Sequence, residues 1–212
     1  FTSSNFELIY LSSQEQIPYS GYRSLNWNNF LIWDKRQEEI LKKVITSNKN
    51  LSFSIVGPIP SFNINKKCTN KKKIDLSNNK TNLILFDVSP HRFSRFIYLG
   101  MPNEYYTYPN VKKFYDDIIT NVDANKCEIF FKIKRSSTNL DKNYSNFLER
   151  LKIEKKIKEI HHDENIFNIF NEKLDFKVIS MPFTGPTYIA NHYNIKSCFY
   201  DPSGKISNTY SW

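Results

Sequence analysis

Short apolar runs, rich in β-branched and aromatic residues, alternate along this chain with segments whose apolar residues recur at helical spacing. Such alternation is typical of repeated strand–helix units, in which parallel strands form a sheet covered by helices on both sides. Most of the runs carry no polar alternation, as expected of strands that are buried on both faces. The sequence therefore predicts an α/β fold with a Rossmann-like, mainly parallel sheet of about six or seven strands flanked by helices.

Seven runs are predicted as strands from their length and residue types. They cover residues 30–33, 51–56, 83–86, 128–132, 157–161, 176–181 and 197–200. The most regular helix is predicted from Val111 to Val122, where apolar residues stand at i, i+3, i+4, i+7 and i+11. Apolar residues between Tyr144 and Leu151 repeat this pattern and predict a second helix.

Capping residues predict two shorter helices. Asp34, with Gln37 three residues later, is typical of a helix start, and Asp163 is predicted to cap a short helix over residues 166–170. The one irregular stretch, residues 61–82, is rich in lysine and asparagine and has no apolar period. It is predicted to be a surface loop.

The 212 residues suffice for one large domain, and hydrophobic residues make up 40% and charged residues 24% of them. These proportions exclude a disordered chain, and no run approaches the ~18–20 consecutive apolar residues that a spanning helix needs. We therefore expect a single folded domain over residues 1–212. The chain starts without a signal-peptide layout, and its three cysteines show no disulfide or zinc spacing. These features favour the cytoplasm, with the cysteines as small buried hydrophobic residues.

The formal net charge is +9, from 30 Lys plus Arg against 21 Asp plus Glu. Such a charge attracts phosphates, nucleic acid or an anionic membrane surface. The chain is also rich in Asn, Lys, Ile, Phe and Tyr, a bias that AT-rich coding DNA produces without a functional cause. The charge is therefore partial evidence for an anionic partner, and peripheral contact with the anionic inner membrane stays an open alternative.

Polar residues follow most of the predicted strands at the point where each strand ends. The carboxyl ends of parallel strands meet at one edge of a sheet, close to helix starts, and ligands bind there. The sequence therefore predicts a ligand site at this edge. Its candidate residues are Gly57, Pro58, Asp87, Ser89, His91, Arg92, Lys132, Lys134, Arg135, Thr184, Gly185, Pro186, Thr187 and Asp201, with Glu104 and Tyr105 as further sugar or base contacts.

The segment Thr184–Thr187 has the clearest chemistry of these. Gly185 lets a ligand approach the backbone, and Pro186 suits the first turn of a helix, where free N–H groups and the dipole attract an anion. The segment is therefore a predicted phosphate site, although an ordinary strand-to-helix turn is an equal alternative. The helix that follows is expected to bury Tyr188 and Ile189.

A basic segment follows the fourth predicted strand. Strand alternation places Lys132 and Lys134 on one face, with Arg135 at the end of the sheet, where it could bind a phosphate with two hydrogen bonds. The alternative is that one or two of these side chains face solvent. The same alternation predicts opposite faces for His161 and His162, so that at most one would reach the site.

The segment from Asp87 to Arg92 offers several polar groups. Asp87 is a strand-end carboxylate, Ser89 is a hydrogen-bond donor, and His91 and Arg92 are candidates for sugar or phosphate contacts. Capping of the turn is an equal alternative for Asp87. The chain contains neither GxGxxG nor GxxxxGK[ST], which argues against dinucleotide oxidoreductases and P-loop enzymes.

Six stretches of the sequence together resemble one family. They are NWNNFLIWDKRQEEIL, FSIVGPIP, LILFDVSPHR, LGMPNEYYTYPNVKKFYDDI, FFKIKR and VISMPFTGPTYIANHYNIKSCFYDP, and they span nearly the whole chain in order. The chain resembles the bacterial polysaccharide-biosynthesis proteins named for a PFTS motif, which are regarded as glycosyltransferases of surface-carbohydrate pathways. Gly185 stands where that motif has serine, which removes one hydroxyl and leaves the backbone anion site.

The resemblance implies a B-type glycosyltransferase, which has two Rossmann-like halves. This chain would be the C-terminal, donor-binding half of such an enzyme, with its upstream acceptor domain missing, and this half need not be active alone. The implied donor is a nucleotide-sugar. A CMP-linked sugar is implied because KIKR and FTGPT resemble the phosphate-binding elements of sialyl- and Kdo-type transferases. The implied acceptor is a saccharide or a lipid-linked saccharide of capsule or O-antigen.

No cofactor and no metal ion is expected for such a transferase, because helix dipoles and basic side chains stabilise the leaving phosphate. The base that activates the acceptor would come from the missing domain, and none is assigned here. Two other functions stay open. One is a sugar-nucleotide epimerase with the same two-half architecture, and the other is a basic nucleic-acid-binding module, which the charge favours although no such motif is present.

Overall fold

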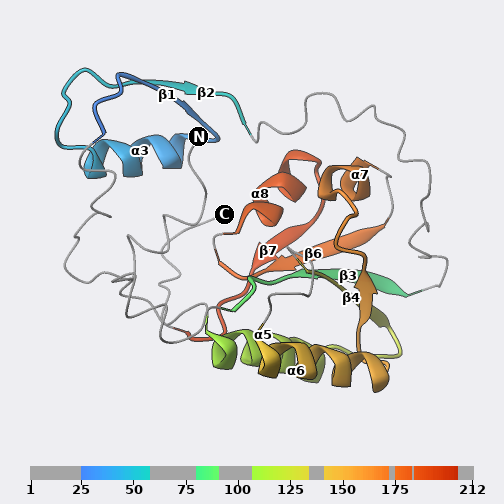
Figure 1. Ribbon diagram of the computed structural model, residues 1–212. Helices are drawn as coiled ribbons and strands as arrows, with labels where there is room; N and C mark the ends of the chain where they lie inside the picture. Colours follow the sequence, from blue (N-terminus) through green and yellow to red (C-terminus); the bar gives the residue numbers. More distant parts are fainter. Residues whose placement is uncertain are drawn as a thin grey trace.

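A computed structural model describes residues 25–57, 80–90, 107–133, 141–171, 175–182 and 184–204 of the chain. Within them, strands and helices alternate as the sequence predicts (Figure 1). The strands are β1 (Asn29–Ile32), β2 (Ser52–Ile55), β3 (Thr81–Phe86), β4 (Cys127–Lys132), β5 (Lys158–Ile160), β6 (Phe176–Ser180) and β7 (Ser197–Phe199). The helices are α3 (Lys35–Val44), α5 (Tyr108–Asn121), α6 (Lys142–Ile153), α7 (Ile166–Asn171) and α8 (Gly185–His192).

The strands form two parallel sheets, one with the order β5-β4-β3-β6-β7 and one made of β1 and β2. In the larger sheet the chain adds β4 and β5 on one side of β3, then returns to add β6 and β7 on the other side. This is the strand order of a doubly wound, Rossmann-like sheet. The α/β, Rossmann-like prediction is confirmed, and two of the seven predicted strands pair in a sheet of their own.

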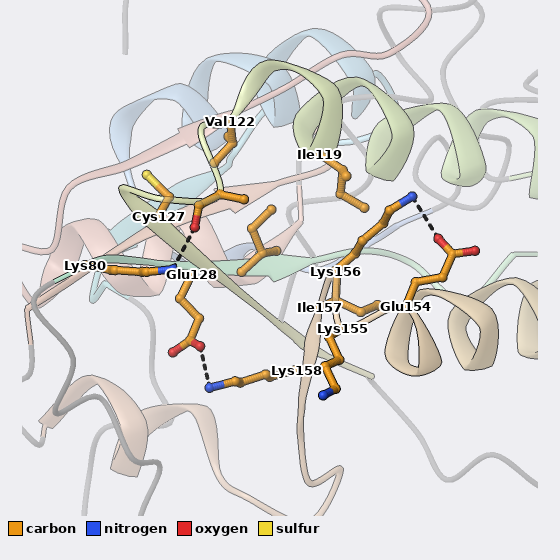
Figure 2. A pocket seen from close by; sticks show the side chains of 12 residues that line it. Lys80, Ile119, Val122, Cys127, Glu128, Glu154, Lys155, Lys156, Ile157 and Lys158 are labelled. Atoms are coloured by element: carbon orange, nitrogen blue, oxygen red, sulfur yellow. Dashed lines mark hydrogen bonds and ion pairs between the residues drawn. The ribbon is translucent and has the colours of Figure 1, made fainter.

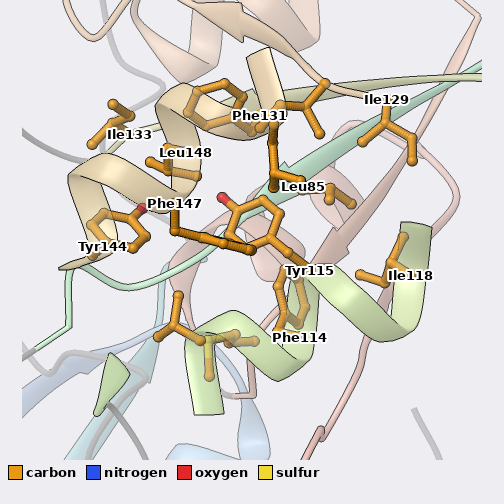
Figure 3. Close-up of a cluster of buried hydrophobic side chains, with 14 of the residues drawn as sticks. Leu85, Phe114, Tyr115, Ile118, Ile129, Phe131, Ile133, Tyr144, Phe147 and Leu148 are labelled. Atoms are coloured by element: carbon orange, nitrogen blue, oxygen red, sulfur yellow. The ribbon is translucent and has the colours of Figure 1, made fainter. Parts of the chain in front are cut away.

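Helices cover both faces of the five-stranded sheet (Figure 1). On one face, Leu85 and Phe131 pack against α5 and α6 in a cluster that includes Phe114 (Figure 3). On the other face, Ile84 packs against α7 and α8 in a cluster that includes Phe170. Successive residues of β3 therefore alternate between two apolar layers, which explains why the sequence of this strand shows no polar alternation.

Side-chain oxygens cap the starts of α3 and α7, and the cap of α7 differs from the prediction. As expected, Asp34 Oδ1 accepts a hydrogen bond from the backbone N–H of Gln37 at 2.8 Å and caps α3. The prediction that Asp163 caps α7 is wrong. The cap is Asn165, whose Oδ1 accepts a hydrogen bond from the backbone N–H of Phe167 at 2.9 Å. Both residue types are good caps, so composition alone does not choose between them. None of the described helices is long and apolar enough to cross a membrane.

The small sheet is covered on one face. Phe30 and Ile32 of β1 are buried against Leu41 of α3, and Leu31 on the opposite face is 50% exposed. Ile55 of β2 is paired with Ile32 on the covered face but is 55% exposed. The expectation that most strands have two covered faces therefore fails for β1 and β2. Parallel sheets are rarely open in this way, because each face carries apolar side chains.

The two described cysteines are free thiols. Cys127 is partly exposed and Cys198 is exposed, so the prediction of buried cysteines is wrong for Cys198. Cys68 lies outside the described residues.

Candidate functional site: the carboxyl ends of β3 and β6

The carboxyl ends of β3 and β6 lie side by side at the centre of the larger sheet. Phe86 and Ser180 are paired in register, and the backbone N–H of Met181 donates to the carbonyl of Phe86 at 3.1 Å. From here the chain continues toward α5 on one face of the sheet and toward α8 on the other. Open α/β sheets bind ligands where the connections diverge in this way.

The start of α8 lacks a side-chain cap. Thr184 precedes the helix, but its Oγ1 donates to the carbonyl of Met181 at 2.9 Å and makes no hydrogen bond to the first helical turn. Pro186 stands in that turn, as predicted. The N–H groups of a first helical turn have no partner within their own helix, and the dipole adds positive potential there. This end of α8 is therefore open to an anion.

Thr187 serves the fold through its side chain. Its Oγ1 donates to the carbonyl of Cys198 at 3.5 Å, and Ser197 Oγ donates to the carbonyl of Thr187 at 3.3 Å. These bonds fasten α8 to β7. Thr184 and Thr187 are both buried, so the predicted threonine hydroxyls are used within the protein. An anion at this place would meet backbone N–H groups.

Trp33, directly after β1, lies against the start of α8. A Cβ atom added to Gly185 would stand 3.6 Å from Trp33 Cη2, and the indole meets the ring of Tyr188 edge-on at 6.0 Å between centroids. Tyr188 is half-buried, so its predicted burial is incorrect, whereas Ile189 is buried as expected. Trp33 was predicted at the end of a strand, and no sequence pattern indicates this contact.

Asp87 is a buried carboxyl at the end of β3. Its Oδ2 accepts hydrogen bonds from the hydroxyl of Tyr115 at 2.8 Å and from that of Tyr144. The two tyrosines project from α5 and α6 (Figure 3). Burial raises the pKa of Asp87 to about 6, although both hydroxyls act to lower it. Asp87 thus ties β3 to two helices, and its side chain is not the turn cap that the sequence left open.

Three buried oxygens at this end of the sheet have no hydrogen-bond partner among the described residues. They are Oδ1 of Asp87, Oγ of Ser89 and Oγ of Ser180. Buried polar atoms are almost always hydrogen-bonded, to protein or to ordered water. Three unpartnered oxygens at the ends of two adjacent strands are expected where a ligand or bound water supplies the missing hydrogen bonds.

Lys132 and the two histidines lie at the ends of β4 and β5. Lys132 Nζ donates to the backbone carbonyl of His162 at 2.9 Å, and burial lowers the pKa of this lysine, which the nearby Glu164 and Asp163 oppose. The rings of His161 and His162 are 4.3 Å apart between centroids. The prediction of opposite faces is therefore wrong, because the chain turns directly after β5 and the strand alternation stops.

Of the remaining predicted site residues, the structure describes Gly57 and Asp201. Gly57 follows β2 of the small sheet, with φ of +72°, and is not on the edge that β3 and β6 form. Asp201 Oδ1 accepts from the backbone N–H and the hydroxyl of Ser203, which closes a turn. Pro58, His91, Arg92, Glu104, Tyr105, Lys134 and Arg135 lie outside the described residues.

A cavity of about 260 Å³ opens at the opposite edge of the sheet, near the amino ends of β3, β4 and β5 (Figure 2). Three of its four lysines have partners there: Lys156 pairs with Glu154 at 2.8 Å, Lys158 pairs with Glu128, and Lys80 donates to a backbone carbonyl. The carboxyl ends of α5 and α6 border it and contribute negative partial charge. This cavity therefore does not suit the predicted phosphate.

The sequence model of one protein family, described as polysaccharide biosynthesis PFTS motif protein, matches residues 8–211. No curated protein and no solved structure is matched by the chain. In the segment that corresponds to the motif, this chain reads Pro182-Phe183-Thr184-Gly185. The motif that names the family thus ends at the open start of α8.

Proposed function

We propose that this chain, which belongs to the polysaccharide biosynthesis PFTS motif proteins, is the donor-binding half of a glycosyltransferase. Its ligand is a nucleotide-sugar, with a CMP-linked sugar as the leading candidate. The sugar is transferred to a saccharide or lipid-linked acceptor held by a second, upstream domain. The proposed reaction needs no cofactor and no metal ion from this half.

The observation that carries the proposal is the open start of α8 beside the ends of β3 and β6. The start of α8, which Thr184 does not cap, and its helix dipole follow β6 directly. Among the described residues, three unpartnered buried oxygens belong to residues at or just after the ends of β3 and β6, with Asp87 on the face that α5 and α6 cover. A nucleotide has the complementary groups, because its phosphate accepts hydrogen bonds and its base and sugar carry both donors and acceptors.

In the proposed mechanism the phosphate of the donor accepts hydrogen bonds from backbone N–H groups at the start of α8. As the sugar departs, negative charge grows on the nucleotide phosphate. The helix dipole and the fixed N–H groups stabilise that charge without reorganising, which lowers the barrier. Among the described residues we assign no base for the acceptor hydroxyl.

The proposal is tested by ligand-observed NMR on the purified chain with CMP, UDP, GDP and a short single-stranded DNA at fixed salt. We expect one mononucleotide class to bind in preference to the others and to the DNA. Preference for CMP would identify the donor class. Binding of DNA alone would replace the proposal with the nucleic-acid module, and absence of binding by all three mononucleotides contradicts a donor site in this half.

A pair of variants at Gly185 tests the position of the phosphate. There is room for the Cβ atom of either side chain, because an added Cβ makes an ordinary contact of 3.6 Å with Trp33. Gly185→Asp places a carboxylate where the phosphate binds, and two like charges ~4 Å apart repel by about 4 kcal/mol at an effective dielectric constant of ~20. We expect it to weaken nucleotide binding by more than about tenfold, while Gly185→Ser leaves binding nearly unchanged.

Thermal melting controls for the fold. An acidic residue in a first helical turn is favourable, so Gly185→Asp should melt no lower than the parent chain. Equal nucleotide affinity in both variants would place the phosphate elsewhere.

A further inference from the structure

The turn that follows β5 gathers three metal-ligating side chains. One ligand atom from each of His161, His162 and Asp163 lies within 4.8 Å of the other two. His162 Nε2 is 3.3 Å from one carboxylate oxygen of Asp163, and His161 Nδ1 is 3.6 Å from the other. Two imidazoles and one carboxylate are therefore brought together by three consecutive residues.

Contacts from both sides hold this turn in place. Ile160, the last residue of β5, is paired with Lys132 of β4, and Lys132 Nζ donates to the carbonyl of His162 at 2.9 Å. On the other side, the backbone N–H of Glu164 donates to the carbonyl of His161 at 3.0 Å. The turn is thus anchored to a central strand of the sheet, so its three side chains start from a defined backbone.

The side chains are accessible to an ion from solvent. The side chains of His161 and Asp163 are 65% and 77% exposed, while that of His162 is 31% exposed. The carboxylates of Asp163 and Glu164 both act on Lys132 and offset its positive charge. An approaching cation therefore meets two carboxylates and two imidazoles beside one ammonium group.

We propose that the turn His161–Asp163 binds a divalent first-row transition-metal ion of the zinc type. Imidazole nitrogen and carboxylate oxygen are ligands that Zn²⁺ accepts readily, whereas Mg²⁺ and Ca²⁺ prefer all-oxygen sites. Three protein ligands leave at least one coordination position for water or for an oxygen of a second molecule. The proposal uses no residue of the proposed nucleotide site, which lies at the ends of β3 and β6, and β4 separates β5 from β3.

The test is isothermal titration of the purified chain with Zn²⁺ at about pH 7.5, where imidazole groups are neutral. We expect one Zn²⁺ per chain. His162→Ala and Asp163→Asn should each weaken Zn²⁺ binding by more than about tenfold. Loss of a residue that only supports a metal ligand already weakens metal binding by about 10–100-fold, and loss of a ligand should cost at least as much. His192→Ala is the matched control, since His192 is an exposed histidine at the far end of α8.

Two further measurements keep the result unambiguous. Circular dichroism shows whether each variant is folded. Because the turn is exposed, we expect both variants to fold. The absorption spectrum of the Co²⁺-loaded chain reports whether a thiolate is a ligand, because Cys127 and Cys198 are free. Absence of Zn²⁺ binding by the parent, a thiolate band, or unchanged binding in both turn variants would overturn the proposal.

Discussion

At the scale of single residues, Asp87 makes the stability of the fold depend on pH. Its pKa in the folded protein is about 6, above the ordinary value of 3.8, so the folded state holds the proton more tightly than the unfolded chain does. Stability contributed by this group is therefore greatest at low pH and is lost as pH rises from about 4 through 6. Across this window the loss amounts to about 3 kcal/mol.

Asp87→Asn tests this dependence. The amide cannot ionise, so the stability of the variant relative to the parent should improve by about 3 kcal/mol between pH 4 and pH 7.5. Urea unfolding at several pH values measures the difference, which cancels contributions from other titrating groups. Parallel profiles for parent and variant would show that folding does not shift the pKa of Asp87.

Tyr144→Phe removes one of the two hydroxyls that donate to Asp87. Because this bond stabilises the ionised carboxyl, its loss should raise the pKa of Asp87 further and cost about 1–3 kcal/mol at neutral pH, with a smaller cost at pH 4. Tyr193→Phe is the control, since its ring packs on Phe170 away from Asp87. Equal costs for Tyr144→Phe at both pH values would argue against the hydrogen bond.

The sequence pointed to Asp87 but not to its role. Tyr115 and Tyr144 were interpreted as core residues from the helical period, which reports burial and carries no information on what a hydroxyl contacts. A buried tyrosine hydroxyl nevertheless needs a hydrogen-bond partner. This requirement could have indicated that a polar group such as Asp87 lies near the two tyrosines. For Thr187, the hydroxyl was assigned to a ligand, and the structure gives it to the carbonyl of Cys198.

At the scale of elements, two glycines behave differently. Gly57 has φ of +72°, a conformation that costs an L-residue roughly 1–2 kcal/mol. Gly185 begins α8 without a positive φ and has room for a Cβ atom. We expect Gly57→Ala to destabilise the protein by about 1 kcal/mol, and Gly185→Ala to be neutral or stabilising by up to about 1 kcal/mol. Urea unfolding of both variants measures this, and destabilisation by Gly185→Ala would mean that the contact with Trp33 is tighter than described.

Element types were predictable because each rests on a local pattern. The seven strands and the helices α5 and α6 appear where apolar runs and helical spacing place them. Features of the turns between the strands and helices were missed. The turn after β5 brings His161 and His162 together, and Asn165 caps α7. The first error arises because strand alternation was extended past the last residue of β5, and the second because Asp163 and Asn165 are both good cap residues.

At the scale of the whole molecule, two exposed apolar residues of the small sheet, one on each face, should make the chain self-associate. Leu31 and Ile55 lie exposed on β1 and β2, and exposed apolar strands attract other chains. We expect Leu31→Thr with Ile55→Thr to reduce light scattering at high protein concentration and to change stability by less than about 0.5 kcal/mol. Ile153→Thr, at a residue that is 73% exposed on α6, is the control and should change neither. Unchanged scattering in the double variant would locate self-association elsewhere.

The division into two sheets could not be predicted from the sequence. Local periodicity says which residues form strands, whereas strand order depends on contacts between segments far apart in the chain. Thr81 pairs with Cys127, and Asn82 pairs with Phe176. For the same reason the sequence spread the candidate residues over most of the strand ends, whereas we propose a site at the ends of β3 and β6.

The central position of β3 also has a consequence for synthesis of the chain. β3 is made before every other strand of its sheet, yet its neighbour β6 begins only at Phe176. Until that residue has left the ribosome, one edge of β3 has no neighbouring strand, and the side chains of Ile84 and Phe86 lack half of their cover. Unpaired edges recruit foreign strands, so the nascent chain, rather than the finished protein, is the form most exposed to mispairing.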